Sequence, residues 1–349
     1  MAEGCELAGI SVQRCSRCRP PCNAYRQRGC TSAPPTVTVG AFPAGIAVNP
    51  RTHTVYVANG GSGKTGTVTV LDDRTCNAAT TSGCKNAHTL QVPGGHALAI
   101  AVNPVTDTLY VATVPSSGPT GPGSRSTVSV FNGATCDATN TTGCGQAPHT
   151  VTVGFSALAL AVNTRTDTIY VANFAHKHTP FAGNTVSVID GATCNATGCG
   201  NTPQTITLGP AFTTPMDVAI DQATDTIYVA DLQNGEGPGT VSVINGATCN
   251  ATTTTGCGHT PPTVTVGFGP SAIAFDPASR TVAVANIEDT SVSVINAATC
   301  NATTTVSCHR AQPKLPVGRA PSAVAIDPAA RNMYIANGDN TVSVIPVNR

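Results

Sequence analysis

Residues 168–173 read Thr-Ile-Tyr-Val-Ala-Asn, and variants of this hexapeptide return along the whole 349-residue chain. The other copies are TVYVAN (54–59), TLYVAT (108–113), TIYVAD (226–231), TVAVAN (281–286) and NMYIAN (332–337). The first four tyrosines of the motif lie 54, 60 and 58 residues apart. A period of this length is typical of an array of supersecondary units, each too small to bury its own hydrophobic face.

Each repeat contains four short segments rich in β-branched residues, separated by turn residues. In the fourth repeat they are 217–221, 226–231, 240–245 and 263–267. Alternation such as Thr-Val-Thr-Val has the period of two that indicates a strand. The sequence therefore predicts an all-β protein, a six-bladed β-propeller of four-stranded antiparallel blades. A parallel β-helix is the main competing fold, but its coils are about half as long as these repeats.

The two ends of the array predict how the propeller closes. Residues 36–40 (TVTVG) match the fourth strand of the other repeats, and residues 341–345 (TVSVI) match the third. We expect the N-terminal strand to complete the last blade, which is a 3+1 closure. A seven-bladed ring, or a fragment of a longer array, remains an alternative.

The segments TVYVAN, TIYVAN and TVSVID resemble the YVTN family of β-propeller repeats, which occur in surface-layer-like and other secreted microbial proteins. The resemblance covers roughly residues 31–349. It implies the propeller fold and a place at the cell surface. It implies little about activity, because propellers carry many unrelated functions.

Most of the fifteen cysteines form local pairs between the third and fourth strands of a repeat. We predict one disulfide hairpin per blade, and the pairs are Cys22/Cys30, Cys76/Cys84, Cys136/Cys144, Cys194/Cys199, Cys249/Cys257 and Cys300/Cys308. Closing a nine-residue loop should stabilise the fold by about 2.5 kcal/mol. A metal site is the competing interpretation, but one pair on each separate blade cannot converge on one zinc ion.

Disulfides on this scale indicate an oxidising compartment, so we expect an extracellular or cell-surface protein. Residues 1–21 lack the apolar core of a signal peptide and are interpreted as a disordered leader, while 22–349 form a single propeller domain. Cys5, Cys15 and Cys18 lie in that leader, and an odd number of thiols leaves at least one unpaired.

The composition argues against two classes of partner. The net charge is zero and only 10% of residues are charged, whereas a nucleic-acid surface needs dense Lys and Arg. No apolar run reaches the 18 residues of a membrane span. No haem, nucleophile-elbow or phosphate-binding motif appears, so no cofactor is predicted.

The loops after the second and fourth strands share one face of the disc, here called the loop face, and they vary between repeats. Recognition is usually carried by variable loops on a rigid scaffold. The candidate binding residues form a basic half and an acidic half: Lys64, Arg125, Phe174, His176, Lys177 and His178, then Asp231, Glu236, Glu288, Asp289 and Asp339. A chance scatter of charges over solvated loops is the alternative. His176 and His178 could chelate a metal only with a third ligand, so no metal site is predicted.

Near the inlet of the axial channel, the first strands offer one charged residue, Asp217, among alanines and a glycine. One carboxylate is neither an acid/base pair nor a calcium cage, and we interpret Asp217 as bonding nearby backbone N–H groups. The predicted function is therefore a binding or scaffold module for a protein or glycan at the cell surface, without catalysis. One alternative is a lactonase- or lyase-type enzyme using Asp217, His176 and His178. Another is the sensor domain of a larger receptor.

Overall fold

The structure, a computed structural model, describes residues 36–62, 65–77, 80–116, 125–174, 183–200, 202–210, 213–233 and 237–347. The chain divides into two units, Met1–Thr36 and Val37–Arg349, and every described strand belongs to the second. In these described ranges no α-helix is present, and none of the helical turns could cross a membrane.

Six antiparallel sheets of described strands follow the sequence repeats, and a seventh, two-stranded sheet lies in the cysteine hairpin of the third repeat. Sheet one contains β1 (Pro43–Asn49), β2 (Thr54–Asn59), β3 (Gly66–Asp72) and β4 (His88–Val92). Sheet two contains β5 (His96–Asn103), β6 (Thr108–Val114), β7 (Arg125–Asn132) and β8 (His149–Phe155). Sheet three contains β9 (Ala157–Asn163), β10 (Thr168–Asn173), β11 (Thr185–Asp190) and β14 (Gln204–Thr207).

The second half of the array repeats the pattern until its last member. Sheet four contains β15 (Thr214–Asp221), β16 (Thr226–Leu232), β17 (Thr240–Asn245) and β18 (Thr263–Thr265). Sheet five contains β19 (Pro270–Asp276), β20 (Thr281–Asn286), β21 (Ser291–Asn296) and β22 (Lys314–Pro316). Sheet six has three strands, β23 (Pro321–Asp327), β24 (Asn332–Asn337) and β25 (Val342–Pro346). Small elements complete the set: β12 (Cys194–Asn195), β13 (Gly198–Cys199) and the 3₁₀ turns η2 (Ser82–Lys85) and η3 (Gly133–Thr135).

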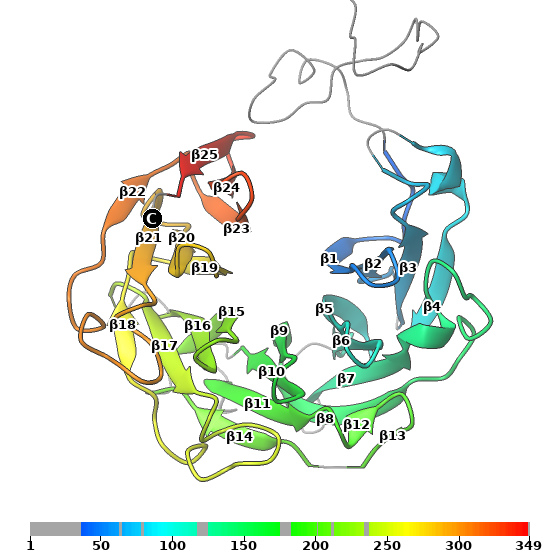
Figure 1. The fold of residues 1–349 in the computed structure, drawn as a ribbon, viewed down its shortest axis with the longest axis horizontal. Helices are drawn as coiled ribbons and strands as arrows, with labels where there is room; N and C mark the ends of the chain where they lie inside the picture. Colours follow the sequence, from blue (N-terminus) through cyan, green and yellow to red (C-terminus); the bar gives the residue numbers. More distant parts are fainter. Residues whose placement is uncertain are drawn as a thin grey trace, which may run out of the picture. The chain divides into compact units, whose positions relative to one another are not determined.

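Within the second unit the sheets follow one another around a common axis, with their first strands innermost (Figure 1). Each first strand packs against the first strand of the next sheet, from β1 on β5 to β19 on β23. The hydrophobic core is therefore divided into layers between successive sheets. In the layer between sheets four and five, Val241 and Val243 of β17 pack with Ile273, Val282 and Val284. This is the arrangement that the repeat period predicts for units that cannot bury their faces alone.

Buried tyrosines join each sheet to the next through one recurrent hydrogen bond. The hydroxyl of the motif tyrosine donates to the carbonyl of the first cysteine in the hairpin of the following sheet, and the pairs are Tyr56–Cys136 (2.9 Å), Tyr110–Cys194 (3.1 Å), Tyr170–Cys249 (2.7 Å) and Tyr228–Cys300 (2.7 Å). Burial raises the pKa of all four hydroxyls, so they remain protonated donors.

Five of the six predicted disulfides are confirmed in the described residues, namely Cys76–Cys84, Cys136–Cys144, Cys194–Cys199, Cys249–Cys257 and Cys300–Cys308. The sixth predicted pair, Cys22 and Cys30, lies outside the described residues, as do Cys5, Cys15, Cys18 and the whole 1–21 leader.

The 3+1 closure is not seen in the described residues. β25 pairs with β24 alone, and the residues from Thr36 to Val39 are not in a strand. In Figure 1 the blue first sheet and the red last sheet stand apart. The side chains agree, because Ile46 of β1 is 67% exposed while its counterparts Ile100 and Ile273 are 8% and 6% exposed.

Candidate functional site

One face of the second unit carries the turns between first and second strands together with the cysteine hairpins; we call it the turn face. Several of its polar side chains hold neighbouring sheets together. The Asn49 amide donates to the carboxylate of Asp107 in the next sheet (2.9 Å). The same bond recurs at Asn103–Asp167 (2.7 Å) and Asn163–Asp225 (3.1 Å).

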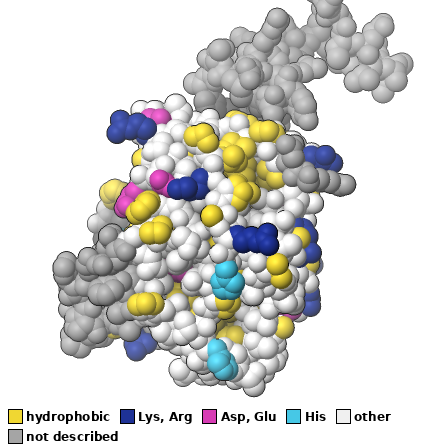
Figure 2. Space-filling model, turned by 90° about the vertical axis from the view of Figure 1, so that its left-hand side faces the viewer, with side chains coloured by type: hydrophobic (Ala, Val, Ile, Leu, Met, Phe, Trp, Pro, Cys, Tyr) yellow, Lys and Arg dark blue, Asp and Glu magenta, His cyan; other side chains and the backbone are white. Residues whose placement is uncertain are grey.

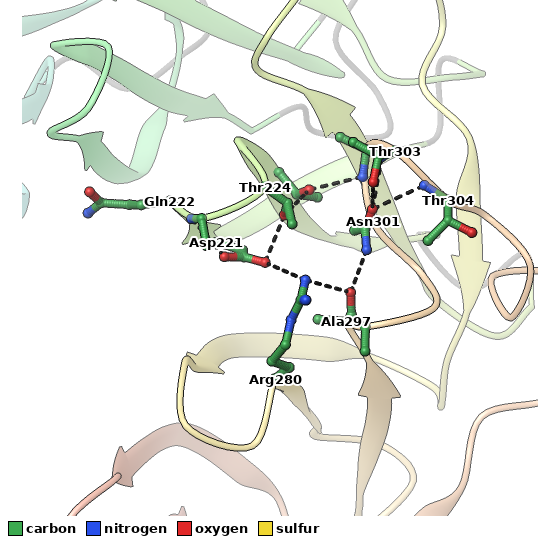
Figure 3. Close-up of polar contacts among 12 residues, drawn as sticks. Asp221, Gln222, Thr224, Arg280, Ala297, Asn301, Thr303 and Thr304 are labelled. Atoms are coloured by element: carbon green, nitrogen blue, oxygen red, sulfur yellow. Dashed lines mark hydrogen bonds and ion pairs between the residues drawn. The ribbon is translucent and has the colours of Figure 1, made fainter.

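Between sheets four and five an Asp–Arg ion pair replaces the Asn–Asp hydrogen bond (Figure 3). The strand-end residue is Asp221, which is almost fully buried, and the turn of the next sheet supplies Arg280 at 3.5 Å. Arg280 also reaches the Ala297 carbonyl (3.5 Å), to which the Asn301 amide donates at 2.7 Å. An Asn–Asp link has therefore become an Asp–Arg link at the same place, and both satisfy the buried acceptor.

Two arginines of the turn face are engaged in the same way. Arg51 donates to the carbonyls of Pro104 and Val105 in the next turn (2.6 and 3.0 Å). Arg165 donates to the carbonyls at Gln222 and Ala223 (2.8 and 3.1 Å). These donors and acceptors are used between sheets, so this part of the turn face holds neighbouring sheets together.

The loop face differs in the kind of apolar side chain that it exposes. The turn face exposes the valines Val105 and Val306, whereas the loop face exposes phenylalanines as well. Phe268 and Ile287 are 44% and 39% exposed on sheet five. Their loops are joined by backbone hydrogen bonds from Ile287 N to Gly269 O (2.8 Å) and from Glu288 N to Phe268 O (3.3 Å). Phe42, at the start of sheet one, is 72% exposed. Exposed aromatic and aliphatic side chains on rigid loops are typical of binding surfaces.

A charge pair borders Phe268 and Ile287. The Lys314 ammonium lies 2.7 Å from the Asp289 carboxylate and is the main cause that holds the pKa of that carboxyl below its usual range. Glu288 is exposed beside them. We call Phe268, Ile287, Glu288, Asp289 and Lys314 the sheet-five patch. It combines an apolar centre with charges at its edge, as protein-binding surfaces do.

The predicted acidic half of the loop face needs one correction. Asp231 was expected to present a surface charge, but this is wrong, because the residue is fully buried at the end of β16. Its Oδ2 accepts from the Ser242 hydroxyl (2.6 Å) and backbone N–H (3.1 Å). Burial raises the pKa of Asp231 to about 8. The hexapeptide itself gave the signal, since the other copies place Asn or Thr here and the position is inward-facing.

The remaining candidate residues are distributed as follows. Arg125 is exposed and its guanidinium lies 5.5 Å from the centre of the Phe155 ring, a cation–π contact. Asp339 accepts from the Thr341 hydroxyl (2.6 Å), the main cause that lowers the pKa of its carboxyl. The Phe174 side chain is half-buried. Lys64, His176, Lys177, His178 and Glu236 lie outside the described residues, so their place on this face stays a prediction.

Asp217, the channel candidate, bridges two sheets. One carboxylate oxygen accepts from the backbone N–H of Val218 (2.8 Å) and the other from that of Ile273 in sheet five (2.9 Å). Burial raises its pKa to about 6, against the effect of these bonds. The interpretation of Asp217 as a residue that bonds nearby backbone N–H groups is confirmed. Among the described residues, no three His, Cys, Asp or Glu side chains gather as metal ligands would.

Sequence reasoning missed Phe42, Phe268 and Lys314 as members of the loop face, and it did not select Ile287 of the 287–289 loop as a binding residue. Phe42 and Phe268 closely follow Gly40 and Gly267, at the end of the Thr-Val-Thr-Val-Gly segment. An apolar residue in a turn that follows a strand was the available signal. The sequence alone could not tell whether such a side chain packs inward or remains exposed.

Comparison with known proteins supports the fold but identifies no family. No protein-family model matches the sequence, and no curated protein does. Among solved structures, the WD40 β-propeller domain of Doa1 is 9% identical with a TM-score of 0.55, covering 88% of this chain and 80% of that one. Hydrazine synthase of Kuenenia stuttgartiensis is 17% identical with a TM-score of 0.48, covering 89% of this chain and 97% of that one. The chain has a β-propeller fold, and the resemblance to YVTN repeats stays a prediction.

Proposed function

We propose that the protein is an extracellular binding scaffold that recognises a protein or glycan partner through its loop face. The observation that carries this proposal is the sheet-five patch, where Phe268 and Ile287 lie exposed on loops that are fixed by backbone hydrogen bonds. The turn face supports it indirectly, because the Asn–Asp and arginine groups of its turns are engaged between sheets. The five disulfides fit an oxidising environment outside the cell.

The proposal assigns recognition, not turnover, to this fold. The enzyme alternative rested on Asp217, His176 and His178. The two histidines lie outside the described residues, and both carboxylate oxygens of Asp217 accept backbone N–H groups. A carboxylate engaged in this way is positioned to join sheets four and five. We assign the secreted, surface-associated character of the YVTN-like repeats to this protein on the strength of the repeat sequence and the disulfides together.

The test compares the loop face with the turn face. Oxidised protein is screened against immobilised extracellular polysaccharides and secreted proteins, and any binder is then titrated against two variants. We expect Phe268→Ser/Ile287→Ser to weaken binding at least roughly tenfold. The matched control is Val306→Ser, which changes a 69% exposed apolar residue on a turn-face hairpin and should bind as the parent does. Equal binding by the parent and both variants would show that the sheet-five patch on the loop face does not contact the partner.

A further inference from the structure

The cysteine hairpin of sheet two binds a glutamine side chain of its own sheet. The Asn132 backbone N–H donates to Oε1 of Gln146 (2.8 Å). Nε2 of the same carboxamide donates to the Gly143 carbonyl (2.8 Å) and to the Asn132 carbonyl (3.1 Å). The hairpin therefore offers one N–H donor and two carbonyl acceptors, which together match both ends of a primary amide.

Sheet five binds a glutamine at the same carbonyl, although that glutamine comes from another position in the sequence. The Gln312 amide donates to the carbonyls of Ser307 (3.0 Å) and Arg310 (2.7 Å). Ser307 immediately precedes the second cysteine of its hairpin, as Gly143 does in sheet two. The carbonyl before this cysteine thus accepts a carboxamide in two sheets.

The hairpin of sheet four has the corresponding backbone groups but no glutamine. Asn245 and Gly256 correspond to Asn132 and Gly143 of sheet two, and the residues after the second cysteine are Gly-His-Thr-Pro-Pro. His259 takes the place of the glutamine. Its ring is exposed and makes no hydrogen bond within the part of the chain that the structure describes.

The N–H of Asn245 points to the outer side of β17. The Val243 N–H donates to the Pro262 carbonyl on that side (2.8 Å), and N–H groups two residues apart in a strand point the same way. Within the described residues the Asn245 N–H has no acceptor, and the Gly256 carbonyl accepts only from the backbone N–H of His259 (3.3 Å). Both groups that hold the glutamine in sheet two are therefore available in sheet four.

These groups line a groove of about 160 Å³, here called the amide groove. Its lining includes Asn245, Thr248 and Gly256, together with Ala302 and Thr305 from the hairpin of sheet five. No Asp, Glu, Lys or Arg is among the described residues that line it. The left-hand side of Figure 1, where β18 and β22 lie, carries mostly neutral side chains (Figure 2). The volume is below the roughly 300–1,000 Å³ of small-molecule sites, so it fits the end of a side chain rather than a whole ligand.

We propose that the amide groove binds the side-chain carboxamide of a glutamine or asparagine that a partner polypeptide presents. The carboxamide oxygen accepts from the Asn245 N–H and its NH₂ group donates to the Gly256 carbonyl, as Gln146 does within sheet two. Strand addition by a partner's main chain does not fit, because Pro261 and Pro262 have no N–H to donate at the groove. This site is separate from the loop face and does not depend on the sheet-five patch.

A free amide tests the groove without a partner. Propionamide, the terminal part of a glutamine side chain, is titrated into ¹⁵N-labelled oxidised protein, and propionate serves as the charged control of the same shape. We expect propionamide to shift the Asn245 amide signal in a saturable way, because it offers both an acceptor and a donor. Propionate lacks the donor and should leave the signal unchanged. The absence of a saturable shift with propionamide would overturn the proposal.

The second arm places the glutamine of sheet two in sheet four. In His259→Gln the protein's own carboxamide should occupy the groove, so propionamide should no longer shift Asn245. We also expect the Asn245 amide to exchange at least roughly tenfold more slowly than in the parent. His259→Met is the matched control, since its side chain has a similar length but can make neither bond. Unchanged exchange and unchanged propionamide binding in His259→Gln would overturn the proposal.

Three further probes identify the source of the amide. The tripeptide Ala-Gln-Ala with acetyl and methylamide ends, its Ala-Glu-Ala counterpart and N-acetylglucosamine are titrated in the same way. We expect the glutamine peptide to bind more tightly than propionamide and at least roughly tenfold more tightly than the other two probes. Binding of propionamide but not of the glutamine peptide would assign the groove to a small amide. Tighter binding of N-acetylglucosamine would assign it to a glycan, and either result overturns the proposal.

Discussion

Sheets four and six contain the same third-strand pentapeptide, TVSVI, at 240–244 and at 341–345. In sheet four its two valines are essentially inaccessible, whereas in sheet six Val342 and Val344 are more than half exposed. The local sequence and the pairing with the second strand are alike in both. The difference therefore comes from the neighbour, and in this fold a strand is stabilised largely by the sheet that follows it.

The largest difference in unfolding free energy should come from placing the same charge on β17 of sheet four and on β25 of sheet six. Val243→Asp buries a carboxylate between sheets four and five without a partner, so we expect a loss of roughly 3 kcal/mol or more in unfolding free energy, or failure to fold. Val344→Asp puts the same charge at the exposed counterpart and should cost less than about 0.5 kcal/mol. Urea unfolding of both variants measures the contrast. A severe effect of Val344→Asp would mean that sheet six is covered in solution.

This contrast also bounds what the sequence could predict. The hexapeptide repeats, the alternating strands and the five described cysteine hairpins could all be predicted from the sequence, because each depends on local residue spacing. The exposure of the third-strand valines could not be predicted, because the sequence TVSVI is identical in sheets four and six. Asp231 is a different case, because its position in the hexapeptide is buried in all six copies and the repeat itself carried that signal. Burial in an array depends on which sheet comes next, and residue spacing within one repeat does not contain that information.

The disulfides provide a second contrast at equal loop length. Cys300–Cys308 is buried in the layer between sheets four and five, and Cys76–Cys84 is half-buried on sheet one; both span eight residues. Loop closure should contribute about 2.5 kcal/mol in each case. We expect Cys300→Ala/Cys308→Ala to cost more than Cys76→Ala/Cys84→Ala, because only the former also opens a cavity. Chemical denaturation of the two double variants measures the difference, and equal losses would assign the whole effect to the loop.

Asp231 and Asn337 occupy the same position in sheets four and six. Only Asp231 can ionise, so only its contribution to the unfolding free energy should depend on pH. The folded-state pKa of Asp231 is raised to about 8, above its unfolded value of 3.8, so the folded state favours the protonated acid. The penalty is absent below the unfolded pKa, grows as pH rises from about 4 to about 8, and is complete above that. Asp231→Asn should stabilise the protein by on the order of 2 kcal/mol at pH 9 and little at pH 4. A stability difference that does not change with pH would mean that Asp231 is hydrated.

The smallest effect concerns the tyrosine hydroxyls of the two sheets. The Tyr228 hydroxyl donates to the Cys300 carbonyl at 2.7 Å in the core, so Tyr228→Phe leaves a buried acceptor unsatisfied and should cost about 1 kcal/mol. Tyr334 has no such bond among the described residues, so Tyr334→Phe should change the unfolding free energy of the full chain by only a few tenths of a kcal/mol. Thermal and urea unfolding of the pair resolves this difference. The contrast depends on a single oxygen atom in otherwise matched strands, so it reports directly on whether a following sheet is present.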